Sequence, residues 1–182
     1  MIELKVIEEY LQCIKSLVNN EEIKAYRFKP YGDEHTVVIL GEKHGDSIEE
    51  CCQEKLIKDL GPKYLLVENI TNNVFKMWGE KYGCKIVLCD LESHEKENKR
   101  RELGFKNFGF NESVSAEYES LKPRLNDARE IKMGEVIMDY YSRESSKPLL
   151  AIIGHTHAME KSKIHSTLKE KAGYITIWQD QE

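Results

Sequence analysis

The chain has 182 residues, the length of about one domain, with 40% hydrophobic residues, 32% charged residues and a net charge of −5. This balance excludes a disordered or low-complexity chain, and a negative charge without a basic stripe argues against nucleic acid as a partner. The longest apolar runs, 37–40 and 149–153, have only four or five residues, whereas a membrane span needs about 20. We therefore expect no membrane span.

Five cysteines, an odd number without C-x-x-C spacing, favour free thiols over a disulfide scaffold or a zinc ribbon. The first residues lack the basic segment and the apolar stretch of a signal peptide. We expect a cytoplasmic protein in which residues 1–182 form a single domain. The sequence does not indicate an oligomeric state.

Residues 1–33 predict an N-terminal helix and a connection. Apolar residues recur with helical spacing on one face between residues 2 and 18. The polar stretch that follows contains Pro30 and Gly32, and we expect a short strand at 25–28 within it.

From residue 36 onward, short apolar strands alternate with helices. A helix expected at 47–60 begins with the capping-box pair Ser47 and Glu50 and ends at Gly61. Strands are expected at 36–40, 64–67, 85–89, 149–153 and 174–178, and further helices at 71–81, 124–142 and 158–171. Continuous apolar strands separated by helices are typical of a parallel sheet covered on both faces. We therefore predict an open three-layer α/β/α fold, Rossmann-like, with a mainly parallel sheet.

The interval 91–123 interrupts this alternation. It is polar, contains Gly104, Gly109 and Pro123, and has no clear helical or strand period. Its 33 residues are too many for a plain connection in a compact domain. We interpret it as an insertion or a lid that closes over the strand ends and contributes substrate contacts.

Polar residues follow four of the predicted strands at the edge where open α/β sheets bind their ligands. These residues are Glu42, His44, Glu68, Asp90, His155 and His157. Gly41 and Gly154 allow sharp turns, and a histidine three residues after each glycine stands at the start of the next helix. The positive end of a helix disfavours imidazolium, and a neutral imidazole can bind a metal or accept a proton.

Arg129 lies early in the helix expected at 124–142 and reaches the same edge if that helix begins on that side of the sheet. There it would pair with Glu68 or bind a negatively charged substrate oxygen, although a surface arginine in a charged helix fits the spacing equally well. We interpret the remaining histidines and three cysteines as ordinary loop or core residues: His35, His94, His165, Cys51, Cys52 and Cys89.

Taken in order, four motifs resemble those of the superfamily that contains erythromycin esterases and the ChaN, TraB and Tiki proteins. They are Gly41-Glu-Lys-His44, the strand-end Glu68, Arg129-Glu-x-x-Met133 and Gly154-His-Thr-His157, and they cover residues 36 to 160. The resemblance implies an α/β fold with its site at the strand ends. Members include macrolide esterases, metal-dependent membrane proteases and a haem-binding lipoprotein, and the present chain lacks the extra helical segments of the first group and a membrane segment.

The resemblance implies Glu42, His44, Glu68, Arg129 and His157 as catalytic residues, and we expect a hydrolase acting on an ester or amide of a small molecule or a peptide. In one form, His44, Glu68 and His157 hold a divalent metal (zinc, manganese or cobalt) that polarises the carbonyl and activates water. In the other, His44 is a general base without a metal, oriented by Glu42 or Glu68. Arg129 would stabilise developing negative charge in both forms.

Two alternatives remain open. One is a binding module for a small molecule or haem, without turnover, in which His44 or His157 is the axial ligand. The other, a minor one, is a metallophosphoesterase-like hydrolase, because Gly154-His-Thr-His157 resembles the last metal motif of calcineurin-like phosphoesterases. Asp33-Glu34-His35 matches the first motif of that family in sequence, but this segment precedes the strand at 36–40 and would lie at the opposite edge of the sheet.

Overall fold

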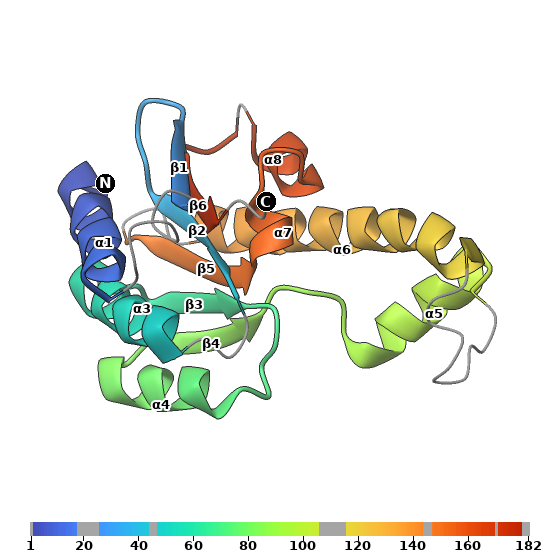
Figure 1. Cartoon of the computed structure of the whole chain (residues 1–182), viewed down its shortest axis with the longest axis horizontal. Helices are drawn as coiled ribbons and strands as arrows, with labels where there is room; N and C mark the ends of the chain where they lie inside the picture. Colours follow the sequence, from blue (N-terminus) through green and yellow to red (C-terminus); the bar gives the residue numbers. More distant parts are fainter. Residues whose placement is uncertain are drawn as a thin grey trace.

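Six strands form one mixed sheet in the order β1-β6-β2-β5-β3-β4 in the computed structural model, which describes residues 2–17, 26–43, 47–105, 116–143, 147–169 and 171–179 (Figure 1). Five strands run parallel, and β1 pairs antiparallel with β6 at one edge. The strands are β1 (Tyr26–Tyr31), β2 (Val37–Glu42), β3 (Tyr64–Val67), β4 (Lys85–Leu88), β5 (Leu149–Gly154) and β6 (Tyr174–Gln179).

Helices cover both faces of the sheet and complete three layers (Figure 1). One face packs against α1 (Leu4–Leu17), α3 (Ser47–Leu60) and α4 (Asn73–Tyr82), and the other against α6 (Ala116–Arg143), α7 (His155–Ala158) and α8 (Lys163–Leu168). The remaining helix, α5 (Ser93–Leu103), packs beside α6 and buries none of its residues. The predicted α/β fold with a mainly parallel sheet is therefore confirmed.

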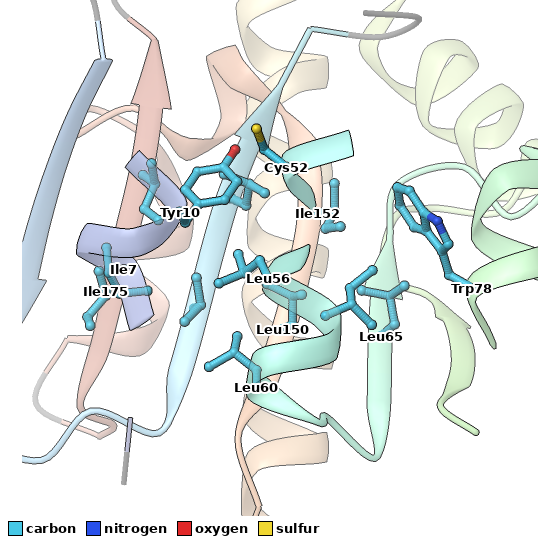
Figure 2. Close-up of a cluster of buried hydrophobic side chains, with 14 of the residues drawn as sticks. Ile7, Tyr10, Cys52, Leu56, Leu60, Leu65, Trp78, Leu150, Ile152 and Ile175 are labelled. Carbon is cyan, nitrogen blue, oxygen red and sulfur yellow. The ribbon is translucent and has the colours of Figure 1, made fainter. Parts of the chain in front are cut away.

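Alternating side chains of each strand build two hydrophobic cores, one on each face of the sheet. In β2, Val38 and Leu40 join the core beneath α1, α3 and α4, whereas Val37 and Ile39 join the core beneath α6 and α8. Figure 2 shows the first core, in which side chains of α1 and α3 meet those of the central strands. All six residues of β2 are buried, as in β5, which explains the continuous apolar runs 37–40 and 149–153 within these strands.

The interval 91–123 has more regular structure than its sequence indicates. It contains α5, and α6 begins at Ala116 and continues through Pro123 instead of starting at 124. The sequence signal is weak here because α5 buries no side chain and so has no apolar period. Residues 106–115 lie outside the described residues, and an insertion or lid role for 91–123 stays a prediction.

The single helix expected at 158–171 is replaced by the shorter α8, which a turn separates from α7, a helix that ends at Ala158. Ser162 begins α8 as its N-cap, and its side chain accepts a hydrogen bond from the Ile164 N–H. No helix within the described ranges is both long and apolar enough to cross a lipid bilayer.

Candidate functional site

The carboxyl ends of the parallel strands bring several polar residues to one edge of the sheet. β2 ends at Glu42, which pairs in register with Gly154 at the end of β5. Glu68 follows β3 directly, Asp90 lies two residues beyond β4, and His157 lies in α7 immediately after β5. The prediction that the strand ends collect polar side chains at this edge agrees with their positions.

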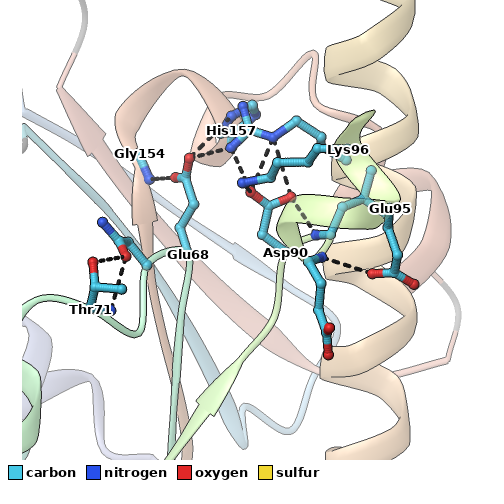
Figure 3. Close-up of polar contacts among 11 residues, drawn as sticks. Glu68, Thr71, Asp90, Glu95, Lys96, Gly154 and His157 are labelled. Atoms are coloured by element: carbon cyan, nitrogen blue, oxygen red, sulfur yellow. Dashed lines mark hydrogen bonds and ion pairs between the residues drawn. The ribbon is translucent and has the colours of Figure 1, made fainter. Parts of the chain in front are cut away.

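Arg129 of α6 joins two of these strand ends. Its Nε lies 3.1 and 3.2 Å from the two carboxylate oxygens of Asp90, and its Nη2 lies 2.7 Å from Asp90 Oδ2. The same Nη2 donates a hydrogen bond to Glu68 Oε1. Lys96 of α5 adds a second cation, with its Nζ 2.6 Å from Asp90 Oδ2 (Figure 3). Of the two alternatives for Arg129, the structure therefore shows the buried pairing and not a solvated surface position.

Burial and neighbouring charges shift the pKa values of these carboxyl groups in opposite directions. Burial raises the pKa of Glu68, but the Gly154 N–H, His157 and Arg129 together outweigh burial and hold this pKa below its usual value. For Asp90, burial is likewise outweighed by Arg129 and Lys96, so its pKa is also lowered. Both carboxyl groups are therefore ionised at neutral pH.

His157 is held between two carboxylates and is only 4% exposed. Its Nδ1 lies 2.9 Å from Glu130 Oε1. Its Nε2 lies 3.9 Å from Glu68 Oε1, and Figure 3 shows this pair. The other oxygen of Glu130 accepts a 2.7 Å hydrogen bond from the Lys163 N–H at the start of α8. Glu130 thus links the His157 ring to α6 and to the start of α8.

The partners of His157 define its tautomer. Burial raises the pKa of Glu130, but hydrogen bonds from His157 and from the Lys163 N–H outweigh burial and lower it, so Glu130 is a carboxylate at neutral pH. A carboxylate accepts hydrogen bonds and cannot donate them, so the Nδ1 of His157 carries the proton. In the neutral ring, Nε2 then presents its lone pair on the side of Glu68.

We call Glu68, Asp90, Arg129, Glu130 and His157 the strand-end cluster. With Lys96, its three carboxylates face two full cations, which leaves one net negative charge when His157 is neutral. The His157 ring therefore lies in a cluster with an excess of negative charge, with Glu130 at its Nδ1 and Glu68 on the side of its Nε2.

Two of the predicted site residues are not brought to this cluster by any described contact. Glu42 lies at the same edge, but its Oε2 accepts a 3.2 Å hydrogen bond from Gln53 of α3, on the opposite face of the sheet. The strand alternation explains this, because Glu42 follows the parity of Leu40, which faces α3, whereas Glu68 follows that of Leu66, which faces α6. His44, the other residue, lies outside the described residues.

Glu130 and Lys96 were not predicted at this edge, and Asp90 was predicted there but not as a catalytic or metal-binding residue. Glu130 follows Arg129 directly, and adjacent residues of a helix point in directions about 100° apart, so pairing both with the strand ends is not readable from spacing. Asp90 has the same strand-end position as Glu68, and this position was the available signal. Lys96 reaches Asp90 from α5, a helix that the sequence does not reveal.

The described donors fit a metal only in part. His157 has the arrangement of a metal-binding histidine, with Nδ1 on a carboxylate and Nε2 available. Glu68 fits less well, because both of its oxygens already accept hydrogen bonds, from Arg129 and from the Gly154 N–H at 2.6 Å. Within the described ranges, no three His, Cys, Asp or Glu side chains are grouped so that they could hold a metal ion, and the third predicted ligand, His44, is outside these ranges.

Two hollows of the described surface lie away from the strand-end cluster. One of about 480 Å³ is lined by Tyr31, Tyr141 and Lys171 among others, and one of about 410 Å³ by Phe28, Glu160 and Trp178 among others. Neither hollow shares a lining residue with the strand-end cluster. Glu68, Glu130 and His157 are mostly covered, and Arg129 is the most exposed side chain of the strand-end cluster, at 17%.

Most of the remaining histidines and cysteines agree with the ordinary roles assigned to them; the exceptions are Cys51 and His35, whose Nε2 is buried without a hydrogen-bond partner among the described residues. His165 is buried and lies 3.1 Å from the Tyr174 hydroxyl and 2.9 Å from the Met159 carbonyl, whereas His94 is exposed. Cys52 and Cys89 are buried as expected. Cys51 is exposed, so its placement on the core face was wrong; the helix turns about 100° between it and Cys52.

Comparisons of this chain with protein-family models, with curated proteins and with solved structures gave no match. The resemblance to the erythromycin esterase, ChaN, TraB and Tiki superfamily therefore rests on the motif residues alone.

Proposed function

We propose that the protein is a hydrolase of an ester or amide and that His157 is its general base. The observation that supports this proposal is the position of the His157 ring, with Nδ1 held by Glu130 and Nε2 facing Glu68. A histidine with one nitrogen fixed by a carboxylate and the other available is the usual arrangement for proton transfer. His44, in the same resemblance, would contribute from the segment that follows Glu42.

In the proposed reaction, His157 Nε2 takes a proton from water while the water oxygen bonds to the carbonyl carbon of the substrate. The same proton then passes to the leaving oxygen or nitrogen as its bond to that carbon breaks. Glu130 holds the ring through its Nδ1 while this proton is on Nε2. Glu68 also keeps Arg129 in place for the negatively charged oxygen of the intermediate.

Arg129 suits this second role because one of its nitrogens remains available. Its Nε and Nη2 bind Asp90 and Glu68, and Nη1 makes no hydrogen bond to any residue in the described ranges. A fixed guanidinium stabilises a developing oxyanion without reorganising, which is usually a large contribution to hydrolysis. If a divalent metal binds, His157 Nε2 is the described atom best placed to hold it, and the metal would then polarise the carbonyl and activate water.

The proposal is tested with a panel of aryl esters, amides and phosphoesters, each assayed with added zinc, manganese or cobalt and with a chelator. We expect His157→Ala to lower kcat/KM at least about 100-fold, since general base catalysis contributes roughly 10²–10⁴-fold. Glu130→Gln should lower it roughly 10- to 100-fold. His94→Ala, which changes an exposed histidine, should leave it unchanged.

An equal rate for His157→Ala and His94→Ala would refute the role of His157. Cleavage of phosphoesters alone would favour the metallophosphoesterase alternative. No turnover of any substrate, together with a Soret band after addition of haem that His157→Ala abolishes, would favour the binding module.

A further inference from the structure

Two cysteines from different helices meet at the edge of the first hydrophobic core. Cys13 lies on α1 and Cys52 on α3, two helices that pack against each other. The Cys52 thiol donates a hydrogen bond to the Cys13 sulfur, with the two sulfur atoms 2.6 Å apart. Figure 2 shows the Cys52 side chain beside Tyr10, a core residue of α1.

This sulfur–sulfur distance is close to that of a covalent bond. A disulfide bond is about 2.04 Å long, so the two sulfur atoms need to approach by only roughly 0.6 Å to form one. Both cysteines are free in this structure. The other described thiols do not share this arrangement: Cys51 is exposed, and the Cys84 thiol faces the Trp78 carbonyl oxygen at 3.8 Å.

We propose that Cys13 and Cys52 are the site of a reversible disulfide that links α1 to α3 when the protein meets a disulfide oxidant such as oxidised glutathione. The inference uses no residue of the strand-end cluster and does not depend on the proposed hydrolase activity.

The accessibility of the two thiols sets the order of the steps. Cys13 is partly exposed and Cys52 is fully buried, so the Cys13 thiolate attacks one sulfur of the oxidant, whose disulfide bond breaks and releases one glutathione thiolate. Cys52 then loses its proton, attacks the Cys13 sulfur and releases the second glutathione. Two protein thiols are oxidised to one disulfide, and one oxidant disulfide is reduced to two thiols.

Burial raises the pKa of Cys52, so its thiol is protonated at neutral pH and is a poor first nucleophile. This supports Cys13 as the residue that meets the oxidant. Once Cys13 carries glutathione, the second attack comes from Cys52 of the same chain, whose sulfur lies next to that of Cys13. Because this attack is intramolecular, we expect that the mixed disulfide does not accumulate.

The crosslink would constrain the part of the chain between the two cysteines, which are 39 positions apart and enclose β1 and β2. Closing a loop of this length limits the unfolded chain, and we expect the melting temperature to rise by roughly 10 °C on oxidation.

The test uses Cys51→Ser as its background, because Cys51 and Cys52 fall in the same tryptic peptide, 44–55, whereas Cys13 falls in 6–15. Cys51 is exposed, so this variant keeps the core intact. The full-length protein is incubated with oxidised glutathione, alkylated and analysed by mass spectrometry before and after dithiothreitol. Cys13→Ser in the same background is the negative control.

We expect the Cys51→Ser protein to lose two hydrogen masses and to yield the 6–15 and 44–55 peptides as one crosslinked species that dithiothreitol separates. The Cys13→Ser control should yield none, and the melting temperature should rise only in the crosslinked protein. A stable glutathione adduct on Cys13 without a crosslink would overturn the proposal, as would a crosslink that forms only when Cys51 is present.

Discussion

Replacing Arg129 with alanine removes the guanidinium that joins Glu68 to Asp90. The side chains of these three residues are 17%, 11% and 0% exposed, so the substitution leaves two largely buried carboxylates with fewer partners. Deleting one partner of a buried ion pair costs roughly 3–5 kcal/mol. Lys96 still contacts Asp90, and the Gly154 N–H still contacts Glu68, so we expect the lower end of this range. A loss of about 3 kcal/mol corresponds to a change of about 150-fold in the unfolding equilibrium.

Urea unfolding at pH 7 measures this loss against an exposed control. Arg101→Ala makes the same substitution in a pair with Glu97, whose Oε1 lies 3.1 Å from the Arg101 Nε, but that arginine side chain is 70% exposed. Exposed helical pairs contribute only about 0.3–0.5 kcal/mol. If Arg129→Ala costs no more than Arg101→Ala, the buried pairing described above is wrong.

The pH dependence of the stability gives a second test of Arg129→Ala. In the wild type, the pKa values of Glu68 and Asp90 are lower in the folded than in the unfolded protein. The stability that these two carboxylates contribute is therefore fully present above their unfolded pKa values, at about 4, and is lost as the pH falls through their folded pKa values. Without Arg129, fewer cations oppose the effect of burial, which raises the pKa of both carboxyl groups. The penalty of the substitution should therefore shrink between pH 7 and about 4.5, and an equal penalty at both pH values would contradict this explanation.

Three further predictions concern the framework of the site. Gly41→Ala should cost about 1–3 kcal/mol in urea unfolding, because its Cβ would lie 2.8 Å from Ala158 Cβ, and a loss near zero would mean that β2 and α7 do not pack this closely. Leu66→Ala, fully buried, should cost about 2–5 kcal/mol, whereas Met77→Ala, 61% exposed, should change stability by less than about 0.5 kcal/mol; equal losses would contradict the core assignment. Burial lowers the pKa of His165, so the wild type should lose stability as the pH falls from about 6.5 through the folded value, and His165→Phe should lose less between pH 7 and 5; identical slopes would place that histidine in solvent.

The layers of the fold could be predicted because the central strands are buried on both sides. The runs 37–40 of β2 and 149–153 of β5 are apolar for this reason, and a run of that kind is visible in a single sequence. Helices without a buried face give no such signal. α5 buries no side chain, and the start of α6 lies before Pro123, so their sequences read as a polar interval.

The site could be predicted where strand direction alone fixes position. Parallel strands carry Glu68 and Asp90 to one edge, and the turn after Gly154 brings His157 to the same edge. The face of the sheet on which a side chain lies depends on its position in the alternation of the strand and on the helix that packs there. Glu42 lies on the face of α3 and is therefore separated from the strand-end cluster. The partnership of Glu130 with His157 depends on the rotation of α6 about its axis, which spacing along the chain does not determine.

Nitrogen-15 NMR of the histidine side chains measures most directly whether Glu130 fixes the His157 ring and leaves Nε2 available toward Glu68. A His157→Gln variant assigns the resonances, and His94, whose side chain is 70% exposed, supplies the reference for an exposed ring. We predict that neutral His157 carries its proton on Nδ1, with the Nε2 shift of an unprotonated nitrogen. A proton on Nε2, or averaged shifts like those of His94, would contradict the arrangement on which the proposed proton transfer depends.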